Sequence, residues 1–223
     1  MSTKLYHTEI DTVIDISETY IPSLVIEEPT FFRSVLTDLY AQTSGEDGRF
    51  TLSNNDKNMP FGTWVEVIDN CLQLNLNTKP LVNKILSAME KTAMAEELFL
   101  ETVNLLQQLE VYVNKLAFSF DCDIVCERCT VAGVLKGIGI ALRDDYEDPL
   151  ERLADYMELV REFDRDKLFV LVNLRACFAD SHLNRFLETV HTHGYRVLLL
   201  DCFARNKLEL EKRITIDNDL CEF

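Results

Sequence analysis

A strand, a helix and a second strand near the C-terminal end of the chain constrain the fold most. Leu168–Val172 is an uninterrupted apolar run of strand length, and Tyr195–Leu200 is a second strand that is apolar except for Arg196. Between them, Asp180 or Ser181 caps a helix with four apolar residues on its inner face. These residues are Leu183, Phe186, Leu187 and Val190. Such a crossover is right-handed and makes its two strands parallel, so the sequence predicts an α/β fold.

The N-terminal part of the chain shows a second pattern of strand, turn and helix. An apolar run that ends at Ile26 is followed by a tight turn and then by apolar residues at helical spacing from Phe31 to Tyr40. Thr30 is the expected N-cap of this helix, because its hydroxyl can accept a hydrogen bond from a first-turn amide. Shorter strands are expected at Arg49–Leu52 and at Trp64–Ile68.

The middle of the chain has a different character. From Thr78 to Ala117 there is no glycine, and the only proline is Pro80, so the pattern predicts one long helix or two consecutive helices. The region from Phe118 to Arg143 is expected to be irregular. Asp148 and Pro149 then mark the start of another helix, as cap and first helical residue.

The two ends of the chain therefore carry strands, whereas the middle is helical. We expect a discontinuous α/β domain made of residues 1–77 and 165–223, and an inserted α-helical domain made of residues 78–164. Ile214 and Ile216 predict an additional edge strand of the α/β domain.

Net charge restricts the partners that the chain can bind. It holds 22 basic and 38 acidic side chains, which gives a net charge of −16 and argues against non-specific binding of nucleic acid. The imbalance is uneven, since residues 1–75 hold 4 basic and 12 acidic side chains but residues 165–223 hold 9 of each. A closed oligomer could place basic residues on one inner surface, because a phosphate feels charges within about 8 Å.

Hydropathy and cysteine content indicate the compartment. No run of 18 apolar residues occurs, so we expect no membrane span. Seven cysteines stand among ordinary apolar residues, which is typical of reduced thiols. We therefore expect a soluble, cytosolic protein without disulfides or membrane association.

The first strand and helix suggest a P-loop nucleotidase, but its phosphate-binding loop is missing. Phosphate binding at this turn requires glycines and a lysine, and the chain has Glu27–Thr30 there, with two carboxylates. Asp201, at the end of a strand, is interpreted as an ordinary polar residue. A degenerate nucleotide-binding switch remains an alternative to be tested.

Three cysteines have the spacing of an iron–sulfur motif. Cys122, Cys126 and Cys129 match the CxxxCxxC pattern of radical enzymes that use S-adenosylmethionine, so an iron–sulfur enzyme is a further alternative. Such enzymes have this motif near the start of a large barrel, and fewer than 100 residues follow Cys129 here. We favour a helical segment that places the three thiols on one face as small buried residues.

Three acidic residues lie in the same region. Asp121, Asp123 and Glu127 fall within seven residues, and carboxylates are the ligands that calcium prefers. The spacing matches no EF-hand, so the residues alone favour a solvated acidic loop over a calcium site.

The order of elements resembles one known family. The resemblance is carried by the strand and helix at Ile21–Tyr40, the strand at Trp64–Asp69, the paired strands Lys167–Asn173 and Tyr195–Asp201, and the ending Ile214–Leu220. The family is the small ring-forming CRISPR-associated adaptation protein of type II-A systems. The likeness covers nearly the whole chain and is one of pattern and order.

The resemblance implies a fold and a function. It implies a P-loop-NTPase-like head with a degenerate nucleotide site, an inserted α-helical leg domain, and four subunits that close into a ring around duplex DNA. It also implies a non-enzymatic role in spacer acquisition, beside the CRISPR integrase subunits and the type II effector nuclease. Calcium would stiffen the subunit, and the resemblance makes Asp121, Asp123 and Glu127 its expected ligands.

A ring of this kind would bind the ends of double-stranded DNA through phosphate contacts that do not read bases. The candidate contacts are Arg49 and Lys57 in the polar loop region of the head, together with Lys136 and Arg143 near the expected calcium region.

Overall fold

The computed structural model describes residues 3–16 and 19–223, and the chain forms two compact units. Unit 1 combines residues 1–74 with residues 146–223, and unit 2 consists of residues 75–145. The sequence-based domain boundaries assigned residues 146–164 to the helical insertion, whereas the contacts place them in unit 1.

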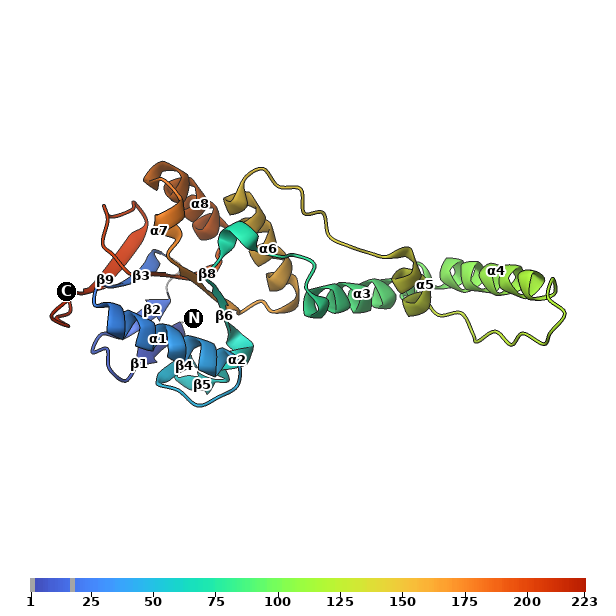
Figure 1. Ribbon diagram of the computed structural model, residues 1–223, viewed down its shortest axis with the longest axis horizontal. Coiled ribbons are helices and arrows are strands. Elements are labelled where there is room, and N and C mark those ends of the chain that lie inside the picture. The colour runs from blue at the N-terminus through green and yellow to red at the C-terminus, as the bar shows by residue number, and fades with distance from the viewer. Residues whose placement is uncertain (1–2, 17–18) are drawn as a thin grey trace. The chain divides into compact units, whose positions relative to one another are not determined.

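A five-stranded parallel sheet forms the centre of unit 1 (Figure 1). Its strand order is β6-β7-β8-β3-β9, and every pair of neighbours is parallel. The strands are β3 (Ile21–Ile26), β6 (Val65–Ile68), β7 (Leu168–Val172), β8 (Arg196–Asp201) and β9 (Glu211–Ile216). This arrangement confirms the mixed α/β class, the parallel pairing of the two C-terminal strands, and the edge strand at Ile214 and Ile216.

Both faces of this sheet are covered, so the central strands β3, β7 and β8 are buried along almost their whole length without alternation. Helix α1 (Pro29–Thr43) covers one face, and α6 (Pro149–Phe163), α7 (Leu174–Cys177) and α8 (Asp180–His193) cover the other (Figure 1). On the α1 face, Val35 and Leu39 pack against sheet residues such as Leu24 and Val170 in one core.

A second, antiparallel sheet completes this core. Its order is β2-β1-β4-β5, and its strands are β1 (Thr3–His7), β2 (Ile14–Ile16), β4 (Phe50–Asn54) and β5 (Lys57–Met59). A strand was predicted at β4, but none was predicted at β1, β2 or β5. Leu5 and Ile14 are nevertheless almost completely buried in the shared core. The short helix α2 (Phe61–Trp64) leads from this sheet into β6, so Trp64 is helical and not part of the strand.

Helix α6 belongs to unit 1 because its apolar face is buried there. Asp148 accepts a 2.9 Å hydrogen bond from the amide of Leu150, which confirms the predicted cap. Leu153 and Met157 are fully buried, and α6 packs against α8 and against the 3-10 turn η1 (Cys71–Gln73). Sequence periodicity located the helix correctly, but it carried no information about which core the helix joins.

The N-cap of α1 differs from the prediction. Glu28, and not Thr30, caps the helix, and its side chain accepts hydrogen bonds from the amides of Thr30 and Phe31. Pro29 explains the shift, because proline is favoured at the first helical position and places the cap one residue before it. At the other end of the chain, Gly194 closes α8 in the left-handed conformation that glycine tolerates.

Unit 2 contains α3 (Lys79–Ala93), α4 (Phe99–Ala117) and α5 (Val131–Ile138). The stretch from Thr78 to Ala117 thus forms two helices, one of the two expected alternatives. Helix α5 lies within the region that was expected to be irregular, and it packs against α3. The side chain of Asn77 exchanges two hydrogen bonds of 2.7 and 3.0 Å with the backbone of Leu142, which fastens the two ends of the unit together. Among the described helices, none is long and apolar enough to cross a membrane.

Candidate functional site

The carboxyl end of β3 is where a P-loop fold would hold a phosphate. Here the carboxylate of Glu28 lies at the N-terminus of α1 and accepts 3.0 and 2.6 Å hydrogen bonds from the amides of Thr30 and Phe31. These two backbone hydrogen bonds lower the pKa of Glu28 below its ordinary value, so the group is ionised at neutral pH. A carboxylate therefore satisfies the amides that would otherwise attract an anion, and it repels a phosphate from the same position.

Asp201 takes part in a buried ionic cluster at the end of the neighbouring strand β8. Its Oδ2 atom lies 3.2 Å from Nε of Arg175, and the Arg175 guanidinium also donates to Glu211. All three side chains are almost completely buried. Burial raises the pKa of Asp201 to about 6, although the positive charge of Arg175 opposes this shift. Asp201 was interpreted as an ordinary polar residue at the end of a strand. The structure shows that it also belongs to a buried cluster with Arg175 and Glu211.

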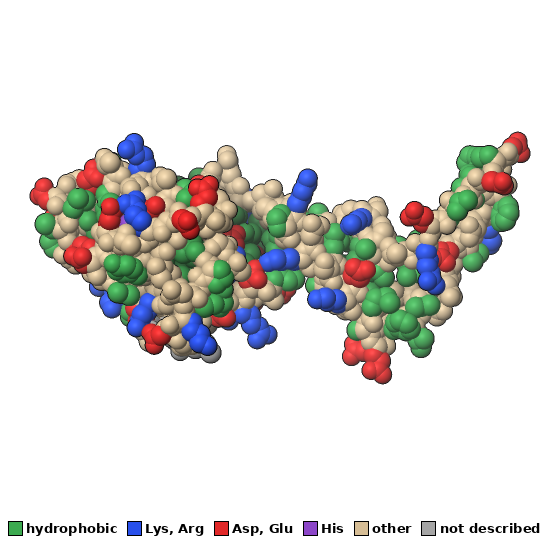
Figure 2. Space-filling model, turned by 90° about the horizontal axis from the view of Figure 1, so that it is seen from below, with side chains coloured by type: hydrophobic (Ala, Val, Ile, Leu, Met, Phe, Trp, Pro, Cys, Tyr) green, Lys and Arg blue, Asp and Glu red, His purple; other side chains and the backbone are tan. Residues whose placement is uncertain are grey.

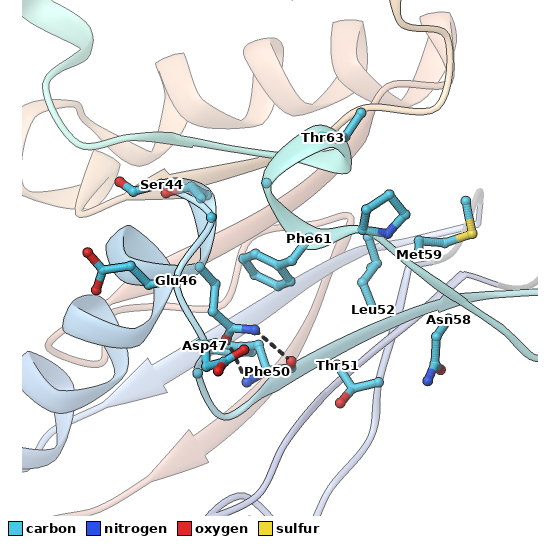
Figure 3. A pocket seen from close by; sticks show the side chains of 16 residues that line it. Ser44, Glu46, Asp47, Phe50, Thr51, Leu52, Asn58, Met59, Phe61 and Thr63 are labelled. Atoms are coloured by element: carbon cyan, nitrogen blue, oxygen red, sulfur yellow. Dashed lines mark hydrogen bonds between the residues drawn. The ribbon is translucent and has the colours of Figure 1, made fainter.

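An open pocket of about 620 Å³ lies beside the end of α1 (Figure 3). Gln42 accepts from the amide of Phe50 and donates to its carbonyl, and the rings of Phe50 and Phe61 stack 5.6 Å apart behind the pocket. Glu46 and Asp47 lie on its rim, and the lining residues described include no lysine, arginine, histidine or cysteine. The pocket therefore offers no cation to a nucleotide or to a DNA phosphate.

Arg49, the first candidate phosphate contact, is engaged within unit 1. Its Nε donates a 2.7 Å hydrogen bond to Asp38, and its guanidinium also pairs with Glu9 and donates to Ser34. His7 approaches the same carboxylate oxygen of Asp38 at 3.1 Å. The structure thus places Arg49 in a network that joins the antiparallel sheet to α1.

The other three candidate contacts differ in their surroundings. Arg143 is exposed and forms a two-pronged ion pair with Asp145, so its charge is locally compensated. Lys57 on β5 and Lys136 on α5 are exposed, and no ion pair with any of the described residues is found for either lysine. Two of the candidates lie in unit 1 and two in unit 2.

The three expected calcium ligands do not assemble into a site. Asp121, Asp123 and Glu127 are all exposed, in the segment between α4 and α5 that has no regular structure. Glu127 lines a pocket of about 350 Å³ against α4, and the two aspartates are not part of its lining. Among the described residues, no three His, Cys, Asp or Glu side chains are grouped closely enough to hold a metal ion. The ligand set of a single described chain therefore does not fit calcium.

The cysteine segment also differs from the interpretation given above. Cys122 and Cys126 are exposed and Cys129 is half-buried, and the segment from 123 to 130 is not helical. The prediction that these thiols share a buried helical face is therefore wrong. The amide of Cys129 donates a 2.9 Å hydrogen bond to Glu110 of α4, which fixes the extended path of the segment.

Helix α4 carries an apolar stripe that the described structure leaves in solvent. Four of its residues recur at intervals of four, three and four, which places them on one helical face. These residues are Leu105, Leu109, Tyr112 and Leu116, with exposed fractions of 58, 42, 59 and 49%. No residue of α4 is fully buried. In the right-hand part of Figure 2, where Figure 1 places α3 to α5, hydrophobic side chains appear openly on the surface. The periodicity was visible in the sequence, but periodicity cannot distinguish a core face from an interface.

Comparison with known proteins agrees with the layout. No curated protein matches the chain by sequence. The family model described as CRISPR-associated protein (Cas_Csn2) matches residues 42–220, which include β4 to β9 and all of unit 2. Because this match covers most of the chain, the protein belongs to the CRISPR-associated protein (Cas_Csn2) family, and this membership supports a role in CRISPR spacer acquisition.

Proposed function

We propose that this protein is a non-enzymatic clamp that binds the ends of double-stranded DNA as a homotetrameric ring during spacer acquisition. Family membership supports the CRISPR setting. The observation that carries the assembly is the exposed apolar stripe of α4. The clamp works beside the CRISPR integrase subunits and the type II effector nuclease.

The stripe on α4 favours association with a second copy. Apolar area removed from water contributes about 25 cal/mol per Å², and the faces of Leu105, Leu109 and Tyr112 remain in water in a single chain. An exposed apolar stripe on a helix is stabilised when an identical stripe of a second copy covers it. A ring of four requires a second contact on each subunit in addition to the one through this stripe.

A ring reconciles DNA binding with the net charge of −16. Lys57 and Lys136 are the strongest of the four candidate contacts, because neither is held in an ion pair with the described residues. Arg49 and Arg143 must exchange carboxylate partners before they contact a phosphate. Several such contacts make affinity fall steeply with salt, since each one releases counterions from the DNA.

The head is P-loop-like in this proposal, with its nucleotide site lost. A parallel strand, β3, leads through a tight turn into α1, as in a nucleotide-binding fold, which supports the likeness. Glu28 occupies the anion position at the start of α1 and explains why the site does not serve nucleotide hydrolysis. The protein acts by holding DNA, and the chemistry belongs to its partners.

Calcium belongs to the proposal as a ligand of the assembled ring. Asp121, Asp123 and Glu127 do not converge in one chain, so the complete ligand set requires a changed path of their segment or oxygen atoms from another subunit. Calcium accommodates six to eight oxygen ligands in flexible geometry, which suits carboxylates contributed by an exposed segment without regular structure.

The decisive experiment compares linear and covalently closed circular duplexes of equal length in a gel shift, in calcium and in excess chelator. Light scattering measures the mass of the protein in the same buffers. We expect a species of four times the chain mass that binds linear DNA but not circular DNA. Its binding of linear DNA should be weaker in chelator than in calcium. A monomer indifferent to both forms overturns the proposal, and a brown anaerobic preparation with stoichiometric iron favours the iron–sulfur alternative on Cys122, Cys126 and Cys129.

A further inference from the structure

The loop between β8 and β9 stands out by its charge and its rigidity. In a chain with 38 acidic and 22 basic side chains, the loop of residues 202–210 contains two basic side chains, Arg205 and Lys207, and one acidic side chain, Glu209. Both basic side chains are exposed, and no ion pair is found for either within the part of the chain that the structure describes. The loop is therefore a local source of positive field on an acidic protein.

The backbone of this loop is held by buried charged groups. Arg213 donates hydrogen bonds of 2.7 and 3.2 Å to the carbonyls of Arg205 and Asn206, and Arg175 donates a 2.8 Å hydrogen bond to the same Asn206 carbonyl. Arg175 is 1% exposed, so this anchor lies inside the fold. The carbonyls of two successive residues thus point inward toward guanidinium groups.

The far end of the loop is fastened as well. The amide of Leu208 donates a 2.8 Å hydrogen bond to Glu211, and the amide of Glu209 donates a 3.2 Å hydrogen bond to Asn184 of α8. The side chain of Leu208 is buried. Consecutive backbone groups on both sides of Lys207 are therefore fixed while its side chain stays in solvent.

Arg205 is itself pre-positioned. Its guanidinium carbon lies 5.1 Å from the centre of the Phe203 ring, an arrangement that restricts the side chain while leaving its N–H donors free to face outward. Two cations on a fixed backbone lose little conformational entropy when they bind, in contrast to lysines on a flexible tail. The planar guanidinium fork of arginine also suits the oxygen atoms of a phosphate.

We propose that the loop of residues 203–208 is a DNA-binding element that contacts backbone phosphates of duplex DNA through Arg205 and Lys207. The proposal rests on the proposed function and adds contacts that the sequence reasoning missed. A phosphate is the fitting ligand because the two exposed cations of the loop outnumber its one acidic side chain, Glu209. The segment was recognisable in the sequence only as two basic residues close together, and its rigidity depends on Arg175 and Arg213.

The test measures binding of a short linear duplex of random sequence by fluorescence anisotropy at several salt concentrations. Arg205→Ala combined with Lys207→Ala should weaken binding about five- to ten-fold and should reduce the slope of log affinity against log salt by about 0.9 for each lost contact. The matched control is Lys4→Ala combined with Arg165→Ala, which removes the same charge from exposed positions of the same unit. A charge-preserving exchange, Arg205→Lys with Lys207→Arg, should keep most of the affinity and the salt slope.

The outcomes separate this inference from the function on which it rests. If the wild type binds linear DNA and the double alanine variant binds it with equal affinity and slope, the loop is not a contact and the clamp stands. An equal loss in the control pair also overturns the inference, because only net charge then matters. If the wild type binds no DNA under any condition, the proposed function and the inference both fail.

Discussion

Arg49 donates a 2.7 Å hydrogen bond from Nε to Oδ2 of Asp38, and this contact joins β4 to α1. Burial by itself would raise the pKa of Asp38, but the hydrogen bonds from Arg49 and His7 outweigh it and lower the pKa below its ordinary value. His7 is almost completely buried against the same carboxylate. The ion pair of Arg49 with Asp38 therefore connects α1 to the antiparallel sheet, with which α1 shares a core.

Removing Arg49 should therefore affect stability more than DNA binding. We expect Arg49→Ala to lower the free energy of unfolding by about 1 to 3 kcal/mol, because it leaves the half-buried carboxylate of Asp38 without its cation. Lys57→Ala, at an exposed position on β5, should change it by less than about 0.5 kcal/mol. Urea unfolding of the two variants and the wild type measures both changes in the free energy of unfolding. Equal stabilities would show that the ion pair contributes nothing.

A charge on the apolar stripe of α4 should prevent assembly. Leu109→Glu places a carboxylate in the middle of the stripe, and a buried unpaired charge costs several kcal/mol at an interface. We expect the variant to be folded but of lower mass than the wild type by light scattering, because Leu109 is already 42% exposed in a single chain. Gln108→Glu adds the same charge beside the stripe and should leave the mass unchanged. A tetramer that survives Leu109→Glu places the interface elsewhere.

Calcium binding can be tested at one of its expected ligands. Asp123→Ala should weaken calcium binding in calorimetry and DNA binding in the gel shift together, since carboxylate oxygens hold the ion and the ion supports the ring. Glu96→Ala removes an exposed carboxylate from another part of unit 2 and serves as the control. Calcium affinity should also rise with protein concentration, because one chain does not gather the ligands. If neither calcium nor DNA binding changes, Asp123 is not a ligand.

The buried carboxyl of Asp201 should make stability depend on pH. Burial raises its pKa to about 6, so between its ordinary value of 3.8 and about 6 the folded state holds a proton that the unfolded state has lost. Stability from this group is therefore present at low pH and lost as pH rises through that window. We therefore compare the free energies of unfolding of Asp201→Asn and the wild type. The difference should shift in favour of the variant by about 1 kcal/mol as pH rises from about 5 to about 7.

Urea unfolding at several pH values above about pH 5 measures this difference, because the lowered pKa values of Asp38 and Glu211 affect stability only at lower pH. The ion pair of Arg175 with Glu211 remains in the variant and keeps the guanidinium compensated. Parallel stability curves for variant and wild type would show that Asp201 titrates outside this range.

Several elements follow from the sequence alone, because local physics specifies them. The apolar run Leu168–Val172 is a strand because only a sheet covered on both faces accepts such a run, and Asp148 caps α6 because its carboxylate reaches a first-turn amide. Gly194 ends α8 for an equally local reason, its tolerance of a positive φ angle.

Which elements pack or pair with one another depends on long-range contacts that no local pattern contains. Arg49 is paired with Asp38, eleven residues away, and the loop carrying Arg205 is fixed by Arg175, which belongs to a different strand connection. The stripe of α4 and the buried face of α6 have the same helical periodicity, yet one is in solvent and the other is in a core. Spacing along a chain fixes which side chains share a face, whereas burial and ion pairing depend on which distant segment comes to lie against that face.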